Sequence, residues 1–236
     1  MRKNFRVESS RLLAMEGKDE CNFFEAMLKH IGIEDVQLVD IGGKDKFKVE
    51  FPLLYNSPGF SEVRSLGFIR DAEDKKADAA FSSIRSVLEK HHLPMPNATK
   101  TIIDGKNDQG KDIRIGIFID GKNDQGKDIR IGIFIMPNNA DKGMLEDRCL
   151  ASVREESVFS CVDEYVKCCL AVLPENERHL NRSKTKVQTY LAARKDIANS
   201  LGIGAHKGYW NLDHPSFDAI KEFLRELSGD PKSQIS

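Results

Sequence analysis

Through its first 137 residues the chain alternates short apolar runs with segments of helical periodicity. The runs "SRLLAME", "VQLVDIGG", "VRSLGFIRD" and "IRIGIFIMP" are typical of strands, and "NFFEAMLKHIG" and "KKADAAFSSIRSVLEKHH" are typical of helices. Between the second and third runs, "FKVEFPLLYNSPGF" is a short helix or an irregular connection. Strands that alternate with helices build a parallel sheet with right-handed crossovers. The pattern therefore predicts an α/β fold with a mostly parallel four-stranded sheet flanked by helices.

The character of the chain changes after Pro137. The segments "GMLEDRCLASV", "CVDEYVKCCLAVL", "SKTKVQTYLAARK" and "DAIKEFLREL" all have helical periodicity. We therefore expect an α/β core over residues 8–137 and a helical C-terminal extension over residues 138–236 that packs on this core. The tail "SGDPKSQIS" is predicted to fray.

One segment, "IDGKNDQGKDIRIGIF", occurs twice in succession, at residues 103–118 and again at 119–134. A repeat architecture needs at least three diverged units, so two identical copies indicate a recent tandem duplication or an engineered insertion. The second copy runs directly into "MPNN", so we assign it the core strand. The first copy is then an added strand or a displaced loop. Because their sequences are identical, the two copies compete for one place in the sheet.

Composition excludes several classes of protein. The 236 residues are 40% hydrophobic and 31% charged, which is typical of a globular chain, and the net charge is −1. Such a chain has no overall attraction to nucleic acid, so contact would require a local basic patch or metal ions. No apolar run approaches the roughly 18 residues of a membrane span, and the N-terminus lacks the apolar core of a signal peptide. We expect a cytoplasmic protein.

Five cysteines occur at positions 21, 149, 161, 168 and 169. An odd number without a CxxC pair argues against a disulfide framework and against a structural zinc site. We interpret these residues as buried, reduced thiols.

Acidic residues follow the predicted strands at the edge where ligands bind in a parallel sheet, beyond the carboxyl ends of the strands. They are Glu16 and Glu20 after the first strand, Asp71, Glu73 and Asp74 after the third, and Glu146 in "GMLED". Carboxylates crowded together resist joint ionisation, and a divalent cation removes that penalty. Oxygen ligands without Cys or His suit Mg²⁺ or Mn²⁺ better than zinc. Each acid also has a simpler interpretation, because carboxylates at helix starts complement the helix dipole.

The acids that follow the first and the third predicted strands form two motifs that resemble those of the Toprim domain. This Rossmann-like domain is shared by topoisomerases, bacterial primases, recombination proteins and overcoming-lysogenization-defect (OLD) nucleases. In "LLAMEGKDE", Glu16-Gly17 corresponds to the first Toprim motif. In "LGFIRDAED", Asp71-Ala72-Glu73 corresponds to the second, with Glu in place of the second Asp. The resemblance is to the OLD-type Toprim and to small stand-alone Toprim-related proteins of unassigned function. It implies Glu16, Glu20, Asp71 and Glu73 as metal ligands, with Glu146 as a further acid and Asp74 as a substitute for Glu73.

Basic residues near these acids are candidates for contact with phosphate. Lys44 and Lys46 lie in "GGKDKFK" after the second strand, Lys184 and Lys186 in "NRSKTKVQTYLAARK", and Lys207 in "AHKGYWNLDHP". We assign Lys184 the neutralisation of developing charge in catalysis. A solvated loop, an exposed helix face and an anchor for the last helix are the respective alternatives.

Two functions are compatible with these features. The first is a Mg²⁺- or Mn²⁺-dependent phosphodiester hydrolase, a Toprim nuclease acting on DNA or RNA, in which Glu16 is a metal ligand or general base and Asp71 is essential. The second is a non-catalytic module that binds a metal or nucleotide and acts through a partner such as a separate ATPase. The four tyrosines lie in no recognisable cleavage context, which argues against a topoisomerase.

Overall fold

The computed structural model describes residues 5–43, 46–73, 77–95, 102–106, 112–139, 141–179 and 181–229. Its centre is a six-stranded sheet with the order β2-β1-β3-β6-β5-β4. The strands are β1 (Arg11–Met15), β2 (Val36–Asp40), β3 (Ser65–Asp71), β4 (Ile102–Lys106), β5 (Asp112–Lys122) and β6 (Asp128–Met136). The first three and β6 are mutually parallel, while β5 runs antiparallel to both of its neighbours. The mostly parallel α/β sheet is therefore confirmed, with two strands more than the four predicted.

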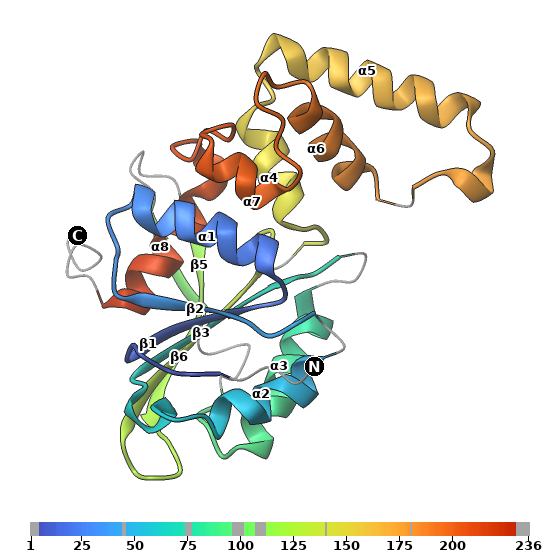
Figure 1. Ribbon diagram of the computed structural model, residues 1–236. Coiled ribbons are helices and arrows are strands. Elements are labelled where there is room, and N and C mark those ends of the chain that lie inside the picture. The colour runs from blue at the N-terminus through green and yellow to red at the C-terminus, as the bar shows by residue number, and fades with distance from the viewer. Residues whose placement is uncertain are drawn as a thin grey trace.

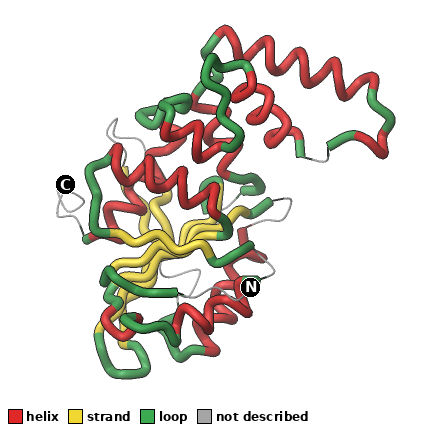
Figure 2. Tube along the Cα trace, in the orientation of Figure 1, coloured by secondary structure: helices red, strands yellow, loops and turns green. Residues whose placement is uncertain are grey.

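The described residues form eight α-helices, and helices pack on both faces of this sheet (Figures 1 and 2). They are α1 (Lys18–His30), α2 (Phe47–Tyr55), α3 (Ala77–Lys90), α4 (Leu145–Ser152), α5 (Ser157–Val172), α6 (Arg182–Ala192), α7 (Leu201–His206) and α8 (Asp218–Ser228). Three short 3-10 turns lie in the connections of the described chain: η1 (Phe60–Glu62), η2 (Glu175–Glu177) and η3 (Pro215–Phe217). Among the described residues, no helix is both long and apolar enough to cross a membrane.

Alternating side chains of each strand divide the core into two layers. Leu13 of β1 and Phe134 of β6 pack with α1, α8 and the other C-terminal helices. Their neighbours Leu12 and Ile133 point the other way and pack with α2 and α3. This division follows from the two-residue period of a strand, which sends successive side chains to opposite faces.

The duplicated segment forms two consecutive hairpins. The second copy supplies β6, which lies beside β3 inside the sheet, and the apolar part of the first copy supplies β5 as an added strand. In both hairpins the three pairs next to the turn have the same register, displaced by 16 residues, which is the repeat length. They are Lys106–Asp112, Gly105–Ile113 and Asp104–Arg114 in one hairpin, and Lys122–Asp128, Gly121–Ile129 and Asp120–Arg130 in the other.

The C-terminal helices share a core with the sheet. Phe223 of α8 is fully buried, with its ring centroid 5.1 Å from that of Phe118 and 5.5 Å from that of Phe134. Trp210 stacks on Tyr190 at 5.1 Å and donates its indole N–H to the carbonyl of Leu201 at 2.9 Å. The loop "AHKGYWNLDHP" therefore anchors this part of the chain through Trp210. Helix α5 packs against α6 and, with it, extends away from the sheet (Figure 1).

The connections leave one place at the sheet edge open for a ligand. From β1 the chain enters α1 on one face, whereas from β3 it enters α3 on the opposite face. The adjacent carboxyl ends of β1 and β3 are therefore a topological switch point, where the two crossovers separate and open α/β sheets bind their ligands. Glu16 and Asp71 lie at these two strand ends.

Candidate functional site

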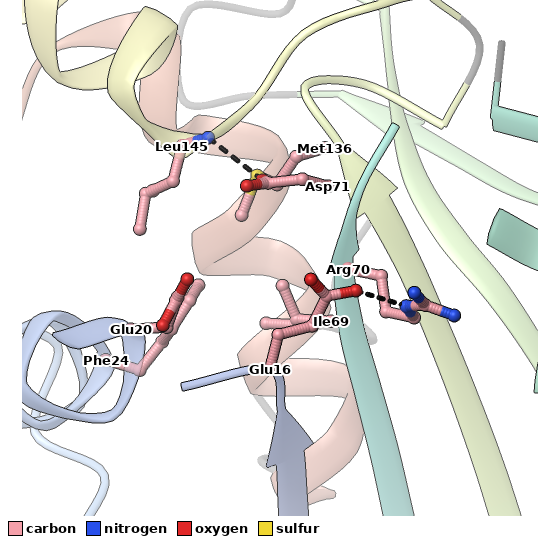
Figure 3. A pocket seen from close by; sticks show the side chains of 8 residues that line it. All are labelled: Glu16, Glu20, Phe24, Ile69, Arg70, Asp71, Met136 and Leu145. Atoms are coloured by element: carbon pink, nitrogen blue, oxygen red, sulfur yellow. Dashed lines mark hydrogen bonds and ion pairs between the residues drawn. The ribbon is translucent and has the colours of Figure 1, made fainter. Parts of the chain in front are cut away.

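A small cavity opens at the carboxyl ends of β1 and β3 (Figure 3). Its polar lining consists of Glu16, Glu20, Arg70 and Asp71, and its apolar wall consists of Phe24, Ile69, Met136 and Leu145. About 10 Å³ is open to the centre of a water molecule, which is room for a single small guest. Two of the acidic motifs that lie far apart in the sequence therefore meet in one cavity.

Glu16 reaches the cavity as a partner of Arg70. The parallel register pairs Ala14 with Phe68, and continuing it by two residues places Glu16 beside Arg70. Its Oε1 accepts a hydrogen bond from Arg70 Nε in a salt bridge, and the two side chains are only 19% and 7% exposed. In Figure 3 the second carboxylate oxygen of Glu16 points away from the arginine.

Glu20 enters the cavity from the first turn of α1. Its carboxylate lies over Gly17, where a Cβ atom would stand only 2.6 Å from Glu20 Oε2. The glycine of "EGKDE" therefore makes room for the carboxylate of Glu20, although its own φ of −156° is open to any residue. Burial raises the pKa of Glu20, with further increases from Asp19, Glu146 and Glu16, while its own backbone N–H lowers it.

Asp71 connects the sheet to α4. Its Oδ1 accepts a hydrogen bond from the backbone N–H of Leu145 at 3.1 Å, as expected of a carboxylate at a helix N-terminus. Burial raises the pKa of Asp71 well above its ordinary value, and Glu146, Glu20 and Glu16 raise it further. Three other carboxylates therefore raise the pKa of Asp71. Their combined negative charge is more than the capping of one helix requires.

Glu146 and Lys184 complete the charged surroundings. Glu146 is 16% exposed on the first turn of α4, and burial is the largest cause of its raised pKa. Lys184 of α6 places its Nζ 4.0 Å from Glu146 Oε1 and counteracts that increase. The lysine is half exposed, so it lies within reach of both Glu146 and a ligand arriving from solvent.

The donor set suits a hard divalent cation. The cluster has four carboxylates, of which Glu16 pairs with Arg70 and Glu146 lies near Lys184, so full ionisation leaves two negative charges unbalanced. Within the described residues, no three His, Cys, Asp or Glu side chains are arranged so that they could hold a metal ion as they stand. An ion would therefore have to draw these side chains toward a common point.

Comparisons with known proteins identify the chain's family. A family model described as "Protein of unknown function (DUF3226)" matches residues 10–229. The chain belongs to the DUF3226 family. A search of curated proteins found no match to this DUF3226 chain.

Two solved structures resemble this DUF3226 protein at low sequence identity. Both are the C-terminal region of the OLD protein of Xanthomonas campestris pv. campestris, phased with mercury and with iodine. The first is 12% identical with a TM-score of 0.48, and the match covers 95% of this chain and 97% of that one. The second is 13% identical with a TM-score of 0.45, and the match covers 95% and 98% of the two chains.

The remaining predicted acids lie away from the cavity or outside the described residues. Glu73 has a φ of 53° and forms a two-way backbone bridge with Gly143, and it does not line the cavity. Asp74 lies outside the described residues.

The predicted phosphate-binding lysines of this DUF3226 chain do not all lie near the acidic cluster. Lys46 is exposed at the start of α2, while Lys44 lies outside the described residues. Lys186 pairs with Asp163 of α5 at 2.5 Å, and Lys207 donates to the carbonyl of Asp196 at 3.1 Å. Of these lysines and Lys184, the described contacts bring only Lys184 to an acid of the cluster.

Sequence reasoning missed Arg70, although the residue stands directly before Asp71. The available signal was a charged residue within the apolar run "SLGFIRD", where burial of an arginine requires a partner.

Two other acids near the site have structural roles. Asp19 accepts the backbone N–H groups of Leu201 and Gly202 at the start of α7, and Asp147 accepts from the hydroxyl of Ser183 at 2.5 Å.

Proposed function

We propose that this DUF3226 protein is a Mg²⁺- or Mn²⁺-dependent phosphodiester hydrolase that cuts DNA or RNA at the cavity between β1, β3 and α4. The observation that carries the proposal is that Glu16, Glu20 and Asp71 line one cavity at the sheet edge, with Glu146 close enough to act on Asp71. Acids from three separate segments meet at the switch point of the sheet, where a ligand is expected. The Toprim resemblance of the two motifs supports the same assignment.

In this proposal Glu16, Glu20 and Asp71 hold the cation, and Glu146 adds negative charge close to Asp71. A divalent cation supplies an activated water and stabilises a leaving oxygen. Asp71 is fixed by the N-terminus of α4, so its carboxylate has little freedom to leave the site. Lys184 is exposed enough to contact a phosphate and carries the positive charge that stabilises a developing negative one.

Replacement of Asp71 by asparagine tests the proposal. Asn keeps an oxygen for the Leu145 N–H but removes the charge, so cleavage of plasmid and single-stranded DNA or RNA in Mn²⁺ should fall by at least about a hundredfold. Asp128→Asn is the matched control, because Asp128 pairs with Lys122 on an exposed hairpin of the same sheet. Cleavage that survives Asp71→Asn would overturn the assignment.

Two features of the acidic cluster favour a second function. One oxygen of Glu16 is occupied by Arg70, and the described acids do not converge on a common point. A non-catalytic module that binds a metal or nucleotide and acts through a partner such as a separate ATPase fits these two facts. Assaying the nuclease activity of the protein alone and then with a co-purified partner separates the two functions.

A further inference from the structure

Arg70 is a buried cation placed against a cluster of acids that is proposed to bind a cation. Its side chain is 7% exposed and contributes to the same cavity as Glu16, Glu20 and Asp71. Coulomb's law alone makes this placement unfavourable for metal binding, because a fixed positive charge repels an incoming ion. The position therefore requires an explanation other than general attraction of ligands.

Packing and stability are weak explanations for this arginine. Buried ion pairs are often no more stable than apolar residues of the same size. In the described part of the chain, Arg70 Nη1 is buried and has no hydrogen-bond partner, which adds a desolvation cost. An apolar side chain at this point of β3 would avoid both costs.

The geometry of the guanidinium indicates a role in orientation. Nε of Arg70 binds Oε1 of Glu16, and the guanidinium carbon lies 5.5 Å from the centre of the Phe47 ring. The hydrogen bond fixes one oxygen of the carboxylate, and the ring fixes the plane of the arginine. The other oxygen of Glu16 is left to face the acids of the cavity (Figure 3).

We propose that Arg70 is a positioning residue that holds one oxygen of Glu16 so that the other is presented to a divalent cation. The proposal rests on metal binding in the proposed function and is independent of phosphodiester hydrolysis. Residues that orient a metal ligand in this way typically contribute 10–100-fold to metal affinity.

Mn²⁺ binding without nucleic acid gives a test in which the sign of the effect decides. We would titrate Mn²⁺ into each variant and follow the electron paramagnetic resonance signal of the free ion. If Arg70 acts only as a nearby positive charge, Arg70→Gln should tighten Mn²⁺ binding. If Arg70 orients Glu16, Arg70→Gln should weaken binding by at least about tenfold. Arg70→Lys should also weaken it, because lysine keeps the charge but loses the planar contact.

A double-mutant cycle shows whether Arg70 acts through Glu16. Combined with Glu16→Gln, the Arg70→Gln change should cause no further loss of Mn²⁺ affinity. Arg130→Gln is the control, since Arg130 also pairs with a glutamate, Glu226 at 2.7 Å, and lies 4.9 Å from the centre of the Phe118 ring. Arg130 pairs with Ser65 at the opposite end of β3, so its loss should leave Mn²⁺ binding unchanged.

Several outcomes would overturn the proposal: unchanged or tighter binding by Arg70→Gln, an equal loss in the Glu16→Gln background, or no Mn²⁺ uptake by the wild type. If Arg70→Gln does not fold, Arg70→Lys and Phe47→Leu carry the test, and both should weaken Mn²⁺ binding. Loss of affinity in this pattern, in a protein that cuts no nucleic acid, would support the role of Arg70 and reject the hydrolase.

Discussion

The three acids of "EGKDE" have three different roles. Glu16 pairs with Arg70, Asp19 accepts two backbone N–H groups at the start of α7, and Glu20 lines the cavity. The sequence predicts that acids gather between β1 and α1, because both elements have clear periodicity. It does not predict their division of roles, because the partners of Asp19 are more than 180 residues away in the chain.

A change at Gly17 should separate stability from binding. In Gly17→Ala the added Cβ would meet the Glu20 carboxylate, which is the flexible end of a side chain and will move. We expect a stability change within about 1 kcal/mol, as for other residues preceding a helix, and a loss of Mn²⁺ affinity of about tenfold. Thermal melting and Mn²⁺ titration measure the two effects, with Glu20→Gln as the comparison. Wild-type affinity in Gly17→Ala would argue against a role for Glu20.

The crowded acids should cost stability when no metal is bound. Since the folded pKa of Asp71 is raised above its ordinary value of 3.8, the folded chain keeps its proton where the unfolded chain has lost it. Unfolding free energy therefore falls as pH rises through that interval and levels off above the folded pKa. Asp71→Asn removes this dependence, so its melting temperature relative to wild type should increase from about pH 4 upward. Melting curves in EDTA test this, and a variant less stable than wild type at about pH 8 would contradict it.

At the scale of elements, glycines in the middle of β3 and β5 leave room for α8 to pack closely against the sheet. A Cβ at Gly67 of β3 would stand 2.6 Å from a Leu227 methyl, and one at Gly116 of β5 would stand 2.8 Å from the Phe223 ring. Glycine inside a strand often marks such a close approach. The sequence predicted the helix from its period, but the surface that receives it is formed by strands from distant parts of the chain.

The duplicated hairpin should be dispensable. Because the register next to the turn is the same in both hairpins, deletion of residues 119–134 lets β4 pair directly with the remaining core strand. Because Ile102–Lys106 contains no aromatic residue, the contact of Phe118 with Phe223 is not replaced, at a cost of about 1 kcal/mol. We expect a folded five-stranded protein with wild-type Mn²⁺ affinity, measured by circular dichroism and titration. An insoluble deletion variant would show that the extra hairpin is required.

At the scale of the whole molecule, two layers of helices enclose one sheet and leave its carboxyl edge for the site. The sequence predicted the four parallel strands and their flanking helices, because short apolar runs and helical periods are local signals. The strand order could not be predicted from the local patterns, since it depends on which crossover takes which face. The sequence assigned the second copy to the core strand, and this copy lies beside β3. Whether the first copy forms an added strand or a displaced loop was left open, and in the structure its apolar part forms β5.

We propose that the acids of this edge share one divalent cation. The most direct measurement is a crystal structure of the protein soaked in Mn²⁺, with anomalous data collected at the manganese edge. We expect an anomalous peak within coordination distance of Glu16, Glu20 and Asp71, with Arg70 still bound to the other oxygen of Glu16. A saturated crystal with no peak at this cavity, or with Mn²⁺ bound only elsewhere, would contradict it.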